Sequence, residues 1–286
     1  MNNQNHKSAP LIATCPACGL LCDDVTLNFS PALSLQNGCA KGVRFFENAF
    51  NTSVSASPLV AGKPASLEIA INAAAEILNH SVQPLFAGLG TEVQGMRSLI
   101  SLAKHTNATM DHIHSESTVS NTRTMQNSGW LTTTLAEVKN RADVILAIGT
   151  DITSTHPRFF EKLAWNTDGL FDKPTPDLIF LGAPEASAKV NIALDGKAPT
   201  IIPAEITQLP EVINTMNALL NGKKIHAEYV AGIPTNTLIA LIEQLKTAKY
   251  AVIVWSASAL KIPHAELTIQ SIVHLISKLN ENSRVA

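Results

Sequence analysis

All four cysteines of this 286-residue chain lie between residues 15 and 39, in the segments TCPACGLLCDD and NGCAKG. Cys15, Cys18 and Cys22 form a close triplet, and Cys39 follows as a single, more distant cysteine. Such a concentration favours shared ligation of one group. The N-terminal segment MNNQNHKSAP is polar and does not resemble a secretory signal, so we expect a cytoplasmic location. Disulfides are rare in the cytoplasm, and a metal is therefore the expected shared ligand.

The spacing of the cysteines distinguishes between kinds of metal site. A zinc ribbon usually presents two short-spaced pairs of ligands, whereas this chain has a triplet and one distant cysteine. A triplet plus one suits a [4Fe–4S] cluster, in which each iron takes one thiolate. Zinc, or reduced thiols without any ligand, remain the alternatives. The residues expected to bind the cluster are Cys15, Cys18, Cys22 and Cys39.

From Ser66 onward, helical and strand patterns alternate along the chain. SLEIAINAAAEILNHS is a predicted helix with Ser66 as its N-cap, and PLFAGLG is a predicted short buried strand. In TLAEVKNRA, Thr134 and Glu137 have the spacing of a capping box. DVILAIGTD is nearly all apolar, which is typical of a parallel strand buried on both faces. The predicted fold class is α/β, with a mostly parallel sheet flanked by helices and a small N-terminal cysteine-rich module.

We predict three parts: a disordered tail at residues 1–10, a four-cysteine module at residues 11–60, and α/β structure at residues 61–286. Residues 51–66, NTSVSASPLVAGKPAS, are small and polar and read as a connector. The four-cysteine module is too small to have much of a hydrophobic core, so a bound metal would stabilise its fold. The chain stops after a long amphipathic helix without a closing strand, and we therefore expect that a C-terminal portion is missing.

Charge and hydrophobicity exclude some partners. The net charge of −2 gives no reason to expect nucleic acid or an anionic membrane as a partner. No apolar run reaches the length of a bilayer span. Charged residues make up only 15% of the chain, which favours burial of part of its surface in a complex.

Two motifs resemble known families. The cysteine triplet with the later Cys-Ala-Lys-Gly is similar to the cluster-binding module of the molybdopterin oxidoreductases. The segment TLAEVKNRADVILAIGTDITSTHPRF resembles the B subunit of formylmethanofuran dehydrogenase, and equally the B subunit of the formyltransferase/hydrolase complex. The resemblance is clear from about Cys15 to about Arg158 and weaker beyond.

This resemblance implies two versions of a reaction. Formylmethanofuran dehydrogenase reduces CO2 to formate at a metal bis-pterin in its B subunit and condenses the formate with methanofuran. The formyltransferase/hydrolase complex moves a formyl group from formyl-tetrahydromethanopterin to methanofuran and then releases formate, in the one-carbon route from formaldehyde to formate. The implied partners are an amidohydrolase-like A subunit, a formyltransferase-like D subunit and a C subunit.

Two departures from the family pattern bear on the choice between these versions. Counting back from Gly129, Ser117 stands where the redox-active members carry the cysteine that binds molybdenum or tungsten. A neutral hydroxyl is a poor substitute for a soft thiolate. Ala183-Pro184-Glu185 replaces an Asp-Pro-Arg-like turn that helps to hold the pterin in relatives. We therefore expect no molybdopterin and no catalytic residue in this chain.

Other polar residues have less specific interpretations. His112, His114 and Glu116 could bind a metal, but they occupy one short segment, and polar surface is the favoured interpretation. His156 belongs to a His-Pro-Arg sequence that matches the family, and its histidine lies near the active metal in relatives; capping of a helix near Pro157 is the alternative. Asp23-Asp24 could tune a cluster bound by the cysteines or form a turn, and the turn is the favoured interpretation.

Two functions remain. The favoured hypothesis is a noncatalytic scaffold subunit of a formyltransferase/hydrolase complex. The alternative is an active formylmethanofuran dehydrogenase redox subunit, which the intact cysteines would suit and in which Ser117 or water would replace the missing ligand.

Overall fold

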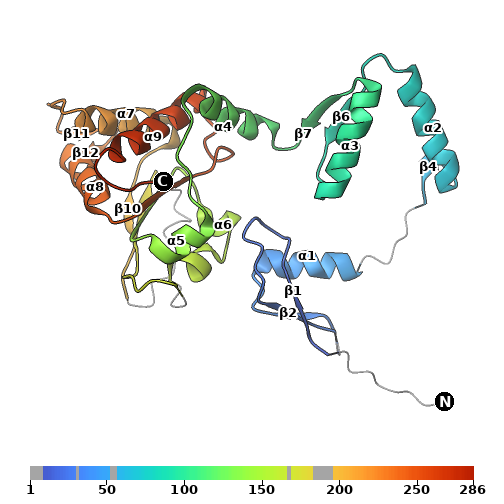
Figure 1. Ribbon diagram of the computed structural model, residues 1–286, viewed down its shortest axis with the longest axis horizontal. Helices are drawn as coiled ribbons and strands as arrows, with labels where there is room; N and C mark the ends of the chain where they lie inside the picture. The colour runs from blue at the N-terminus through green and yellow to red at the C-terminus, as the bar shows by residue number, and fades with distance from the viewer. Residues whose placement is uncertain (1–8, 30–31, 52–56, 166–168, 183–195) are drawn as a thin grey trace. The chain divides into compact units, whose positions relative to one another are not determined.

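The structure is a computed structural model, and it describes residues 9–29, 32–51, 57–165, 169–182 and 196–286 (Figure 1). Contacts divide the chain into two compact units: unit 1 comprises residues 1–48 and 117–286, and unit 2 comprises residues 49–116. This division differs from the predicted parts 11–60 and 61–286, which stay a prediction. The predicted disordered tail, 1–10, lies outside the described residues except for residues 9 and 10. No described helix is both long and apolar enough to cross a lipid bilayer.

A four-stranded parallel sheet forms the centre of unit 1. Its strands, in spatial order, are β10 (Thr200–Ile202), β9 (Asp177–Leu181), β8 (Val144–Ile148) and β13 (Ala251–Trp255). Every residue of β8 is buried, as its nearly continuous apolar sequence predicts. The predicted α/β class with a parallel sheet is confirmed.

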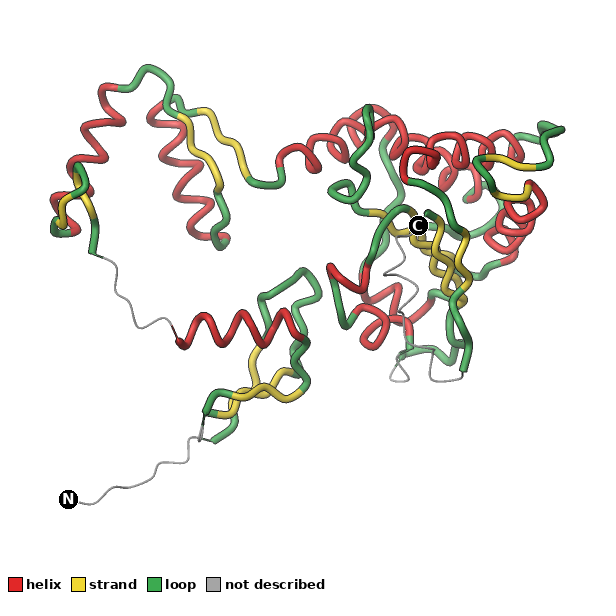
Figure 2. Tube along the Cα trace, turned by 180° about the vertical axis from the view of Figure 1, so that it is seen from behind, coloured by secondary structure: helices red, strands yellow, loops and turns green. Residues whose placement is uncertain are grey.

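Helices cover both faces of this sheet (Figure 2). Leu146 and Ile148 of β8 belong to one hydrophobic cluster and Ile145 and Ala147 to another, because successive side chains of a strand point to opposite faces. The first cluster includes residues of α7 (Leu209–Leu220), α8 (Thr235–Thr247) and α9 (Ala265–Leu279). The second includes residues of α5 (Leu135–Arg141) and of the short π-helix η1 (Phe160–Ala164).

Smaller elements complete the larger part of unit 1. They are α4 (Ser115–Ser128), α6 (Ile152–Thr155), a single turn of 3-10 helix at Ile206–Gln208, and the hairpin of β11 (Tyr229–Val230) with β12 (Ile233–Pro234). Thr134 caps α5 as predicted, since its hydroxyl accepts a hydrogen bond from the Glu137 amide at 3.2 Å. The Glu137 carboxylate pairs with Arg141 at 2.6 Å.

The last residues of the chain pair with the edge of the sheet. The amide of Ala251 donates to the carbonyl of Arg284 at 2.9 Å, and the amide of Ile253 donates to the carbonyl of Ala286 at 2.8 Å. Val285 forms a parallel bridge with Ala251. NENSRVA turns back from α9 onto β13 through these hydrogen bonds and this one isolated bridge, and the described residues form no further strand after β13.

Two glycines lie where the chain passes from the end of a strand close to the start of α7. Gly149 follows β8 with a φ of +58°, and Gly182 follows β9 with a φ of +64°. A Cβ atom at either position would lie 2.7 Å from the side chain of Leu209, the first residue of α7. Only glycine combines this backbone conformation with so close an approach.

The cysteine module consists of a small antiparallel sheet and a helix. The sheet has the order β1 (Leu11–Ala13), β2 (Val25–Asn28) and β3 (Ser34–Gln36), and α1 (Ala40–Asn51) follows. Its buried core contains Cys15, Cys22, Val25, Leu27 and Phe46.

Unit 2 has regular elements but very little core. Its elements are the hairpin of β4 (Leu59–Val60) with β5 (Lys63–Pro64), α2 (Leu67–His80), β6 (Leu85–Gly88), α3 (Val93–Thr106) and β7 (Thr109–His112). The predicted N-cap Ser66 is confirmed, because its hydroxyl accepts from the Ile69 amide at 3.3 Å. The prediction of a buried strand at PLFAGLG is wrong in its burial: β6 pairs in parallel with β7, but Leu85 is 63% exposed.

Candidate functional site

The cysteines come from two places in the N-terminal module: Cys15, Cys18 and Cys22 lie between β1 and β2, and Cys39 lies just before α1. The amide of Cys15 donates to the carbonyl of Cys22 at 2.8 Å, which closes the loop that carries Cys18. Cys39 directly precedes α1, and its carbonyl accepts from the amide of Val43 at 2.9 Å.

Gly42 brings the start of α1 against this loop. A Cβ atom at Gly42 would lie 3.2 Å from the sulfur of Cys15. A glycine here therefore lets the turn that begins with Cys39 approach Cys15 closely. The sequence pattern, a triplet followed by a distant cysteine and a glycine, thus produces a local fold in which all the cysteines belong to one small region.

The thiols differ in burial. Cys15 and Cys22 are buried, Cys18 and Cys39 are half-buried, and none forms a disulfide. Burial raises the pKa of Cys22, and the positive charge of Arg158 opposes this effect. Within the described part of the chain, no group of three or more histidine, cysteine, aspartate or glutamate side chains is arranged to hold a metal ion. Binding of a cluster or of zinc by the cysteines stays a prediction.

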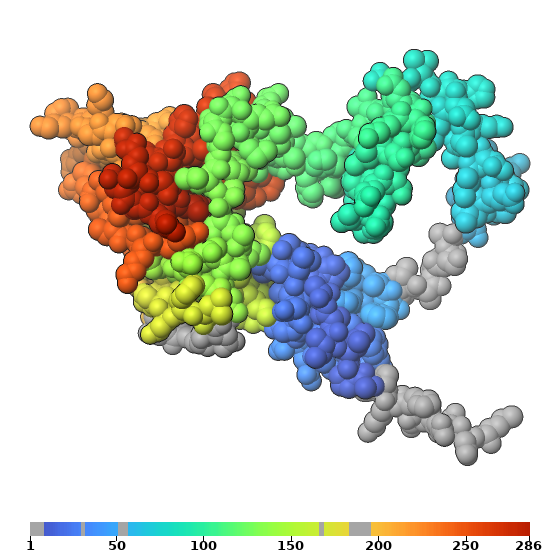
Figure 3. Space-filling model, viewed as in Figure 1, coloured from blue at the N-terminus to red at the C-terminus, as the bar shows by residue number. Residues whose placement is uncertain are grey.

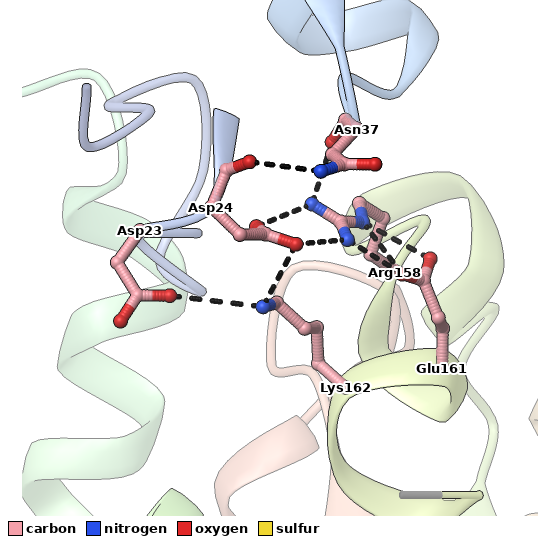
Figure 4. A network of polar contacts seen from close by, with 6 residues as sticks. All are labelled: Asp23, Asp24, Asn37, Arg158, Glu161 and Lys162. Carbon is pink, nitrogen blue, oxygen red and sulfur yellow. Dashed lines mark hydrogen bonds and ion pairs between the residues drawn. The ribbon is translucent and has the colours of Figure 1, made fainter. Parts of the chain in front are cut away.

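Arg158 fastens this module to the rest of unit 1 (Figure 4). Its guanidinium is buried and donates to both carboxylate oxygens of Asp24, at 2.8 and 2.7 Å, and to the carbonyl of Asn37 at 2.6 Å. On its other side it donates to Glu161 at 2.5 to 3.2 Å. Asp24 and Asn37 flank β2 and β3 of the module, whereas Arg158 and Glu161 belong to the segment that covers one face of the large sheet.

Lys162 adds a second cation to the same carboxylates. Its ammonium lies 3.1 Å from Asp24 and 3.6 Å from Asp23, so two consecutive acids of the module meet two cations of the α/β part (Figure 4). We call Asp24, Arg158, Glu161 and Lys162 the module clamp. A two-pronged guanidinium–carboxylate contact fixes orientation as well as distance.

The charges of the module clamp shift its pKa values. Hydrogen bonds from Arg158 hold the pKa of Asp24 well below its usual range, against the effect of partial burial, and Lys162 adds to the lowering. The pKa of Glu161 is also lowered, chiefly by its hydrogen bond with Arg158. The pKa of Arg158 is raised by Glu161 and then by Asp24. Asp24, Glu161 and Arg158 therefore stay charged at neutral pH.

His156 lies beside the cysteine loop. A Cβ atom at Gly19, next to Cys18, would lie 3.7 Å from its Nε2 atom. Its Nδ1 atom lies 3.0 Å from the hydroxyl of Thr155, and Lys41 of α1 donates to the carbonyl of Thr155 at 2.8 Å. Burial and the charge of Lys41 lower the pKa of His156, which favours a neutral imidazole. The ring contacts the hydroxyl of its neighbour Thr155, and it is the backbone carbonyl of His156 that accepts a hydrogen bond from the amide of Phe159, at 2.9 Å.

The other predicted polar residues occupy the segment from β7 into α4. Ser117 lies in the first turn of α4 and is half-buried. The Nδ1 atom of His112 accepts from the amide of His114 at 3.2 Å, and the hydroxyl of Ser115 bonds to the amide and carbonyl of His112. These bonds form a local turn at the carboxyl end of β7. The sequence Ala183-Pro184-Glu185 lies outside the described residues.

The module clamp is the main feature that the sequence interpretation missed. Asp23-Asp24 reads locally as a turn, and its partners are more than 130 residues away in the chain, at a separation of 134 for Asp24 and Arg158. A signal does exist: Arg158 follows an apolar strand and precedes a run of apolar and aromatic residues, and a buried arginine requires a carboxylate. The sequence alone offers 23 acidic residues as that partner.

Curated proteins with similar sequences are B subunits of two kinds of complex. The chain is 28% identical over 249 residues to the B subunit of the tungsten-containing formylmethanofuran dehydrogenase 2 of Methanococcus maripaludis, covering 82% of this chain and 56% of that protein. It is also 28% identical over 225 residues to the B subunit of the formyltransferase/hydrolase complex of Methylorubrum extorquens, covering 79% of this chain and 57% of that protein. No family model matches the sequence.

A solved structure has the same fold over most of the chain. It is the crystal structure of the formyltransferase/hydrolase complex from Methylorubrum extorquens in complex with methylofuran, which matches with a TM-score of 0.63 and 26% identity. The match covers 77% of this chain and 56% of that one. The chain therefore spans less than two thirds of the length of the relatives that it matches.

Proposed function

We propose, from its similarity in sequence and fold to the B subunits of formylmethanofuran dehydrogenase and of the formyltransferase/hydrolase complex, that this chain is the B subunit of a formyltransferase/hydrolase complex. Such a complex would transfer a formyl group from formyl-tetrahydromethanopterin to a methanofuran-type carrier and release formate. The observation that carries the proposal is the match of 77% of the chain to a chain of that solved complex, at a TM-score of 0.63. A cytoplasmic location is part of the proposal.

Within the complex, the chain acts as a noncatalytic scaffold. Its partners are an amidohydrolase-like A subunit, a formyltransferase-like D subunit and a C subunit, which carry out the chemistry. The low share of charged residues, 15%, supports burial against such partners. Many large apolar side chains are exposed in the isolated chain, which also supports assembly.

Loss of redox chemistry is part of the same proposal. Ser117 stands at the position of the cysteine that binds molybdenum or tungsten in redox-active relatives, and its hydroxyl is a poor ligand for these metals. The chain therefore binds no molybdopterin. The sequence Ala183-Pro184-Glu185 also supports this proposal, because it has an acid where relatives carry a cation.

Cys15, Cys18, Cys22 and Cys39 bind a [4Fe–4S] cluster in this proposal, with zinc as the second choice. The close approach of α1 to Cys15 through Gly42, and the loop closed by the Cys15–Cys22 hydrogen bond, support a common ligand. The side chains would have to converge further, because they do not form a metal site in their present positions. The metal would stabilise the module without transferring electrons.

The intact cysteines Cys15, Cys18, Cys22 and Cys39 would suit the alternative of a redox subunit. The chain is as similar to the tungsten-containing protein of Methanococcus maripaludis as to the Methylorubrum protein, at 28% identity in both cases. In this version the chain holds a metal pterin and a [4Fe–4S] cluster, and water or Ser117 completes the coordination of the metal.

Elemental analysis distinguishes the two versions. The tagged chain is purified without oxygen from its own cells, together with its partners, and Mo, W, Fe and Zn are counted per chain. The scaffold proposal requires no Mo or W, copurification of A-, C- and D-type subunits, and formyl transfer by the complex. Molybdenum or tungsten near one atom per chain would overturn it in favour of the redox subunit.

A further inference from the structure

A cavity opens at one end of the large sheet of unit 1. Its volume is about 360 Å³, which is in the range of pockets that hold small ligands. Its lining comes from the end of α5, from the segment before β9, from the residues just before β13 and from Arg284. Figure 3 shows residues 169–174, in yellow, beside the green surface of α5.

Positive charge is concentrated around this cavity. Four of the chain's 21 lysines and arginines line it: Arg141, Lys173, Lys249 and Arg284. The acids in the lining are Asp143 and Asp172. The cations therefore outnumber the acids by two, in a chain whose net charge is −2. Such an excess of one sign of charge in a cavity favours a ligand of the opposite sign.

Asp143 stabilises the fold around the cavity. Its carboxylate accepts hydrogen bonds from the amides of Lys249 and Tyr250, at 2.8 and 2.9 Å, and so joins the start of β13 to the start of β8. The cavity thus lies at the amino ends of these strands. Ligands of open α/β sheets usually bind at the carboxyl ends, so the fold class alone does not predict a site here.

Three of the cations can pair with a ligand. Lys249 and Arg284 have exposed side chains, and no ion pair of either is found among the described residues. Lys173 is half-buried and donates one hydrogen bond, to the carbonyl of Ala142 at 2.9 Å, which leaves two of its N–H donors. Burial lowers the pKa of Lys173, against the charge of Asp143, and an anion in the cavity would stabilise its charged form.

An aromatic side chain lies next to these cations. Phe171 is 50% exposed, and the guanidinium of Arg141 lies 4.8 Å from the centre of its ring, which is a favourable cation–π contact. Arg141 also pairs with Glu137, so its charge is partly neutralised. Pro174 and Tyr250 add further apolar surface to the lining. Apolar walls with a few polar groups are typical of sites for small organic molecules.

We propose that this cavity binds a small organic anion. The carboxylate or phosphate group of the ligand pairs with Lys173, Lys249 and Arg284, because both groups offer the anionic oxygens that these side chains recognise. The apolar body of the ligand packs against Phe171. The proposal does not depend on the formyl-transfer function.

Titration calorimetry of the full chain at low salt tests the proposal with two probes, phenyl phosphate and benzene-1,2-dicarboxylate. We expect at least one to bind with a dissociation constant of about 1 mM or below, as is reasonable for ligands of this size. The tighter probe identifies the preferred anionic group. Neutral benzyl alcohol should not bind. Absence of saturable binding of both probes, or equally tight binding of inorganic phosphate, would overturn the proposal.

Charge substitutions locate the binding site. Lys249→Gln and Arg284→Gln should each weaken binding of the tighter probe by about fivefold, and Asp172→Asn should strengthen it. Arg123→Gln is the control, since it removes an exposed arginine that does not line the cavity, and it should leave the affinity unchanged. Unchanged affinity in both Lys249→Gln and Arg284→Gln would contradict the proposal, provided that their thermal midpoints show folded protein.

Lysine acetylation distinguishes a small ligand from a partner subunit as the occupant. The chain alone and the complex purified through a tag on this chain are treated with an acetylating reagent, and modification of Lys249 is measured by mass spectrometry. The tighter probe should protect Lys249 in both samples. Protection of Lys249 in the complex without any probe would show that a partner polypeptide covers the cavity, and would overturn the proposal. If the probe protects Lys249 but the complex transfers no formyl group, the proposed function fails while this inference stands.

Discussion

At the scale of single residues, Arg158 decides how the cysteine module is attached to unit 1. Its guanidinium is buried and contacts Asp24, Asn37 and Glu161, so it joins segments that are distant in the chain. A buried ion pair adds little compared with apolar packing, but removal of one partner alone is costly.

Replacement of Arg158 measures this attachment. We expect Arg158→Leu to lower the free energy of unfolding by about 2 kcal/mol, because Asp24 loses its two strongest hydrogen bonds; water recovers part of this cost at the half-exposed carboxylate. Arg123→Leu is the matched control: its ion pair with Glu266 is 3.6 Å long and its side chain is 63% exposed, so the expected loss is below about 0.5 kcal/mol. Urea unfolding followed by circular dichroism measures both. Equal losses of unfolding free energy in the two variants would show that the module clamp stabilises the fold no more than an exposed ion pair does.

The module clamp also predicts a dependence of stability on pH. Its folded-state carboxyl pKa values are lowered, so the clamp stabilises the fold above the ordinary values of 3.8 for Asp24 and 4.5 for Glu161. This contribution is lost as pH falls below those values toward the lowered ones. The difference in unfolding free energy between wild type and Arg158→Leu should therefore be full at pH 7 and shrink steadily below about pH 4.5. A difference that stays constant down to pH 3 would rule out the clamp as its source.

At the scale of elements, the burial of a strand depends on the strands beside it, which the apolar pattern of its own sequence does not specify. The apolar run of β8 predicts its burial on both faces correctly, because that burial follows from local composition. The same reasoning fails for β6, whose apolar sequence is exposed. The difference lies in the neighbouring strands, which surround β8 but not β6.

The close turn after β8 gives a test at this scale. Gly149→Ala should destabilise the chain by about 3 kcal/mol, because the new Cβ would lie 2.7 Å from Leu209 and 2.8 Å from Leu260 at a φ of +58°. Gly222→Ala is the control: its φ is +73°, but nothing lies within 4 Å, so only about 1 kcal/mol of backbone strain is expected. Thermal unfolding of the purified variants compares them. A similar loss at both sites would mean that crowding by Leu209 is relieved.

The cysteine module offers a second test. Cys18 is half-buried and lies outside the small core, so Cys18→Ser should change packing little but remove a ligand. If the cysteines share a metal, iron or zinc per chain should fall at least tenfold in protein purified without oxygen, and the thermal midpoint should decrease. Ala17→Ser, at the neighbouring position, should retain the metal. Unchanged metal content in Cys18→Ser would contradict the predicted ligand set.

At the scale of the whole molecule, stability is concentrated in unit 1. The large cluster around the sheet contains most of the fully buried side chains, whereas unit 2 buries only Ala103 among its described residues. Small units without a core depend on neighbours for their stability.

Two matched truncations compare the units. Ile272→Ala removes a side chain of α9 that is fully buried, and should lower the free energy of unfolding of the isolated chain by about 2–5 kcal/mol. Ile77→Ala removes the same atoms from a side chain that is 68% exposed, and should change it by less than about 0.5 kcal/mol. Chemical unfolding of the isolated chain measures both. A large loss for Ile77→Ala would show that α2 is already packed in the chain alone.

The sequence by itself determined the features that depend on neighbouring residues. The caps at Ser66 and Thr134, the parallel α/β order and the both-face burial of β8 follow from local hydrogen bonding and hydrophobic periodicity. The similarity to the B subunits was equally present in the sequence.

Only the tertiary structure decided which distant groups meet. The pairing of Arg158 with Asp24, the return of Ala286 onto β13 and the exposure of α2 depend on the packing of elements, which local patterns do not encode. The physical reason is that a buried charge, or an amide at the edge of a sheet, can pair with any group of suitable chemistry, and the chain contains many such groups. The fold brings one of them within hydrogen-bonding distance and excludes the others.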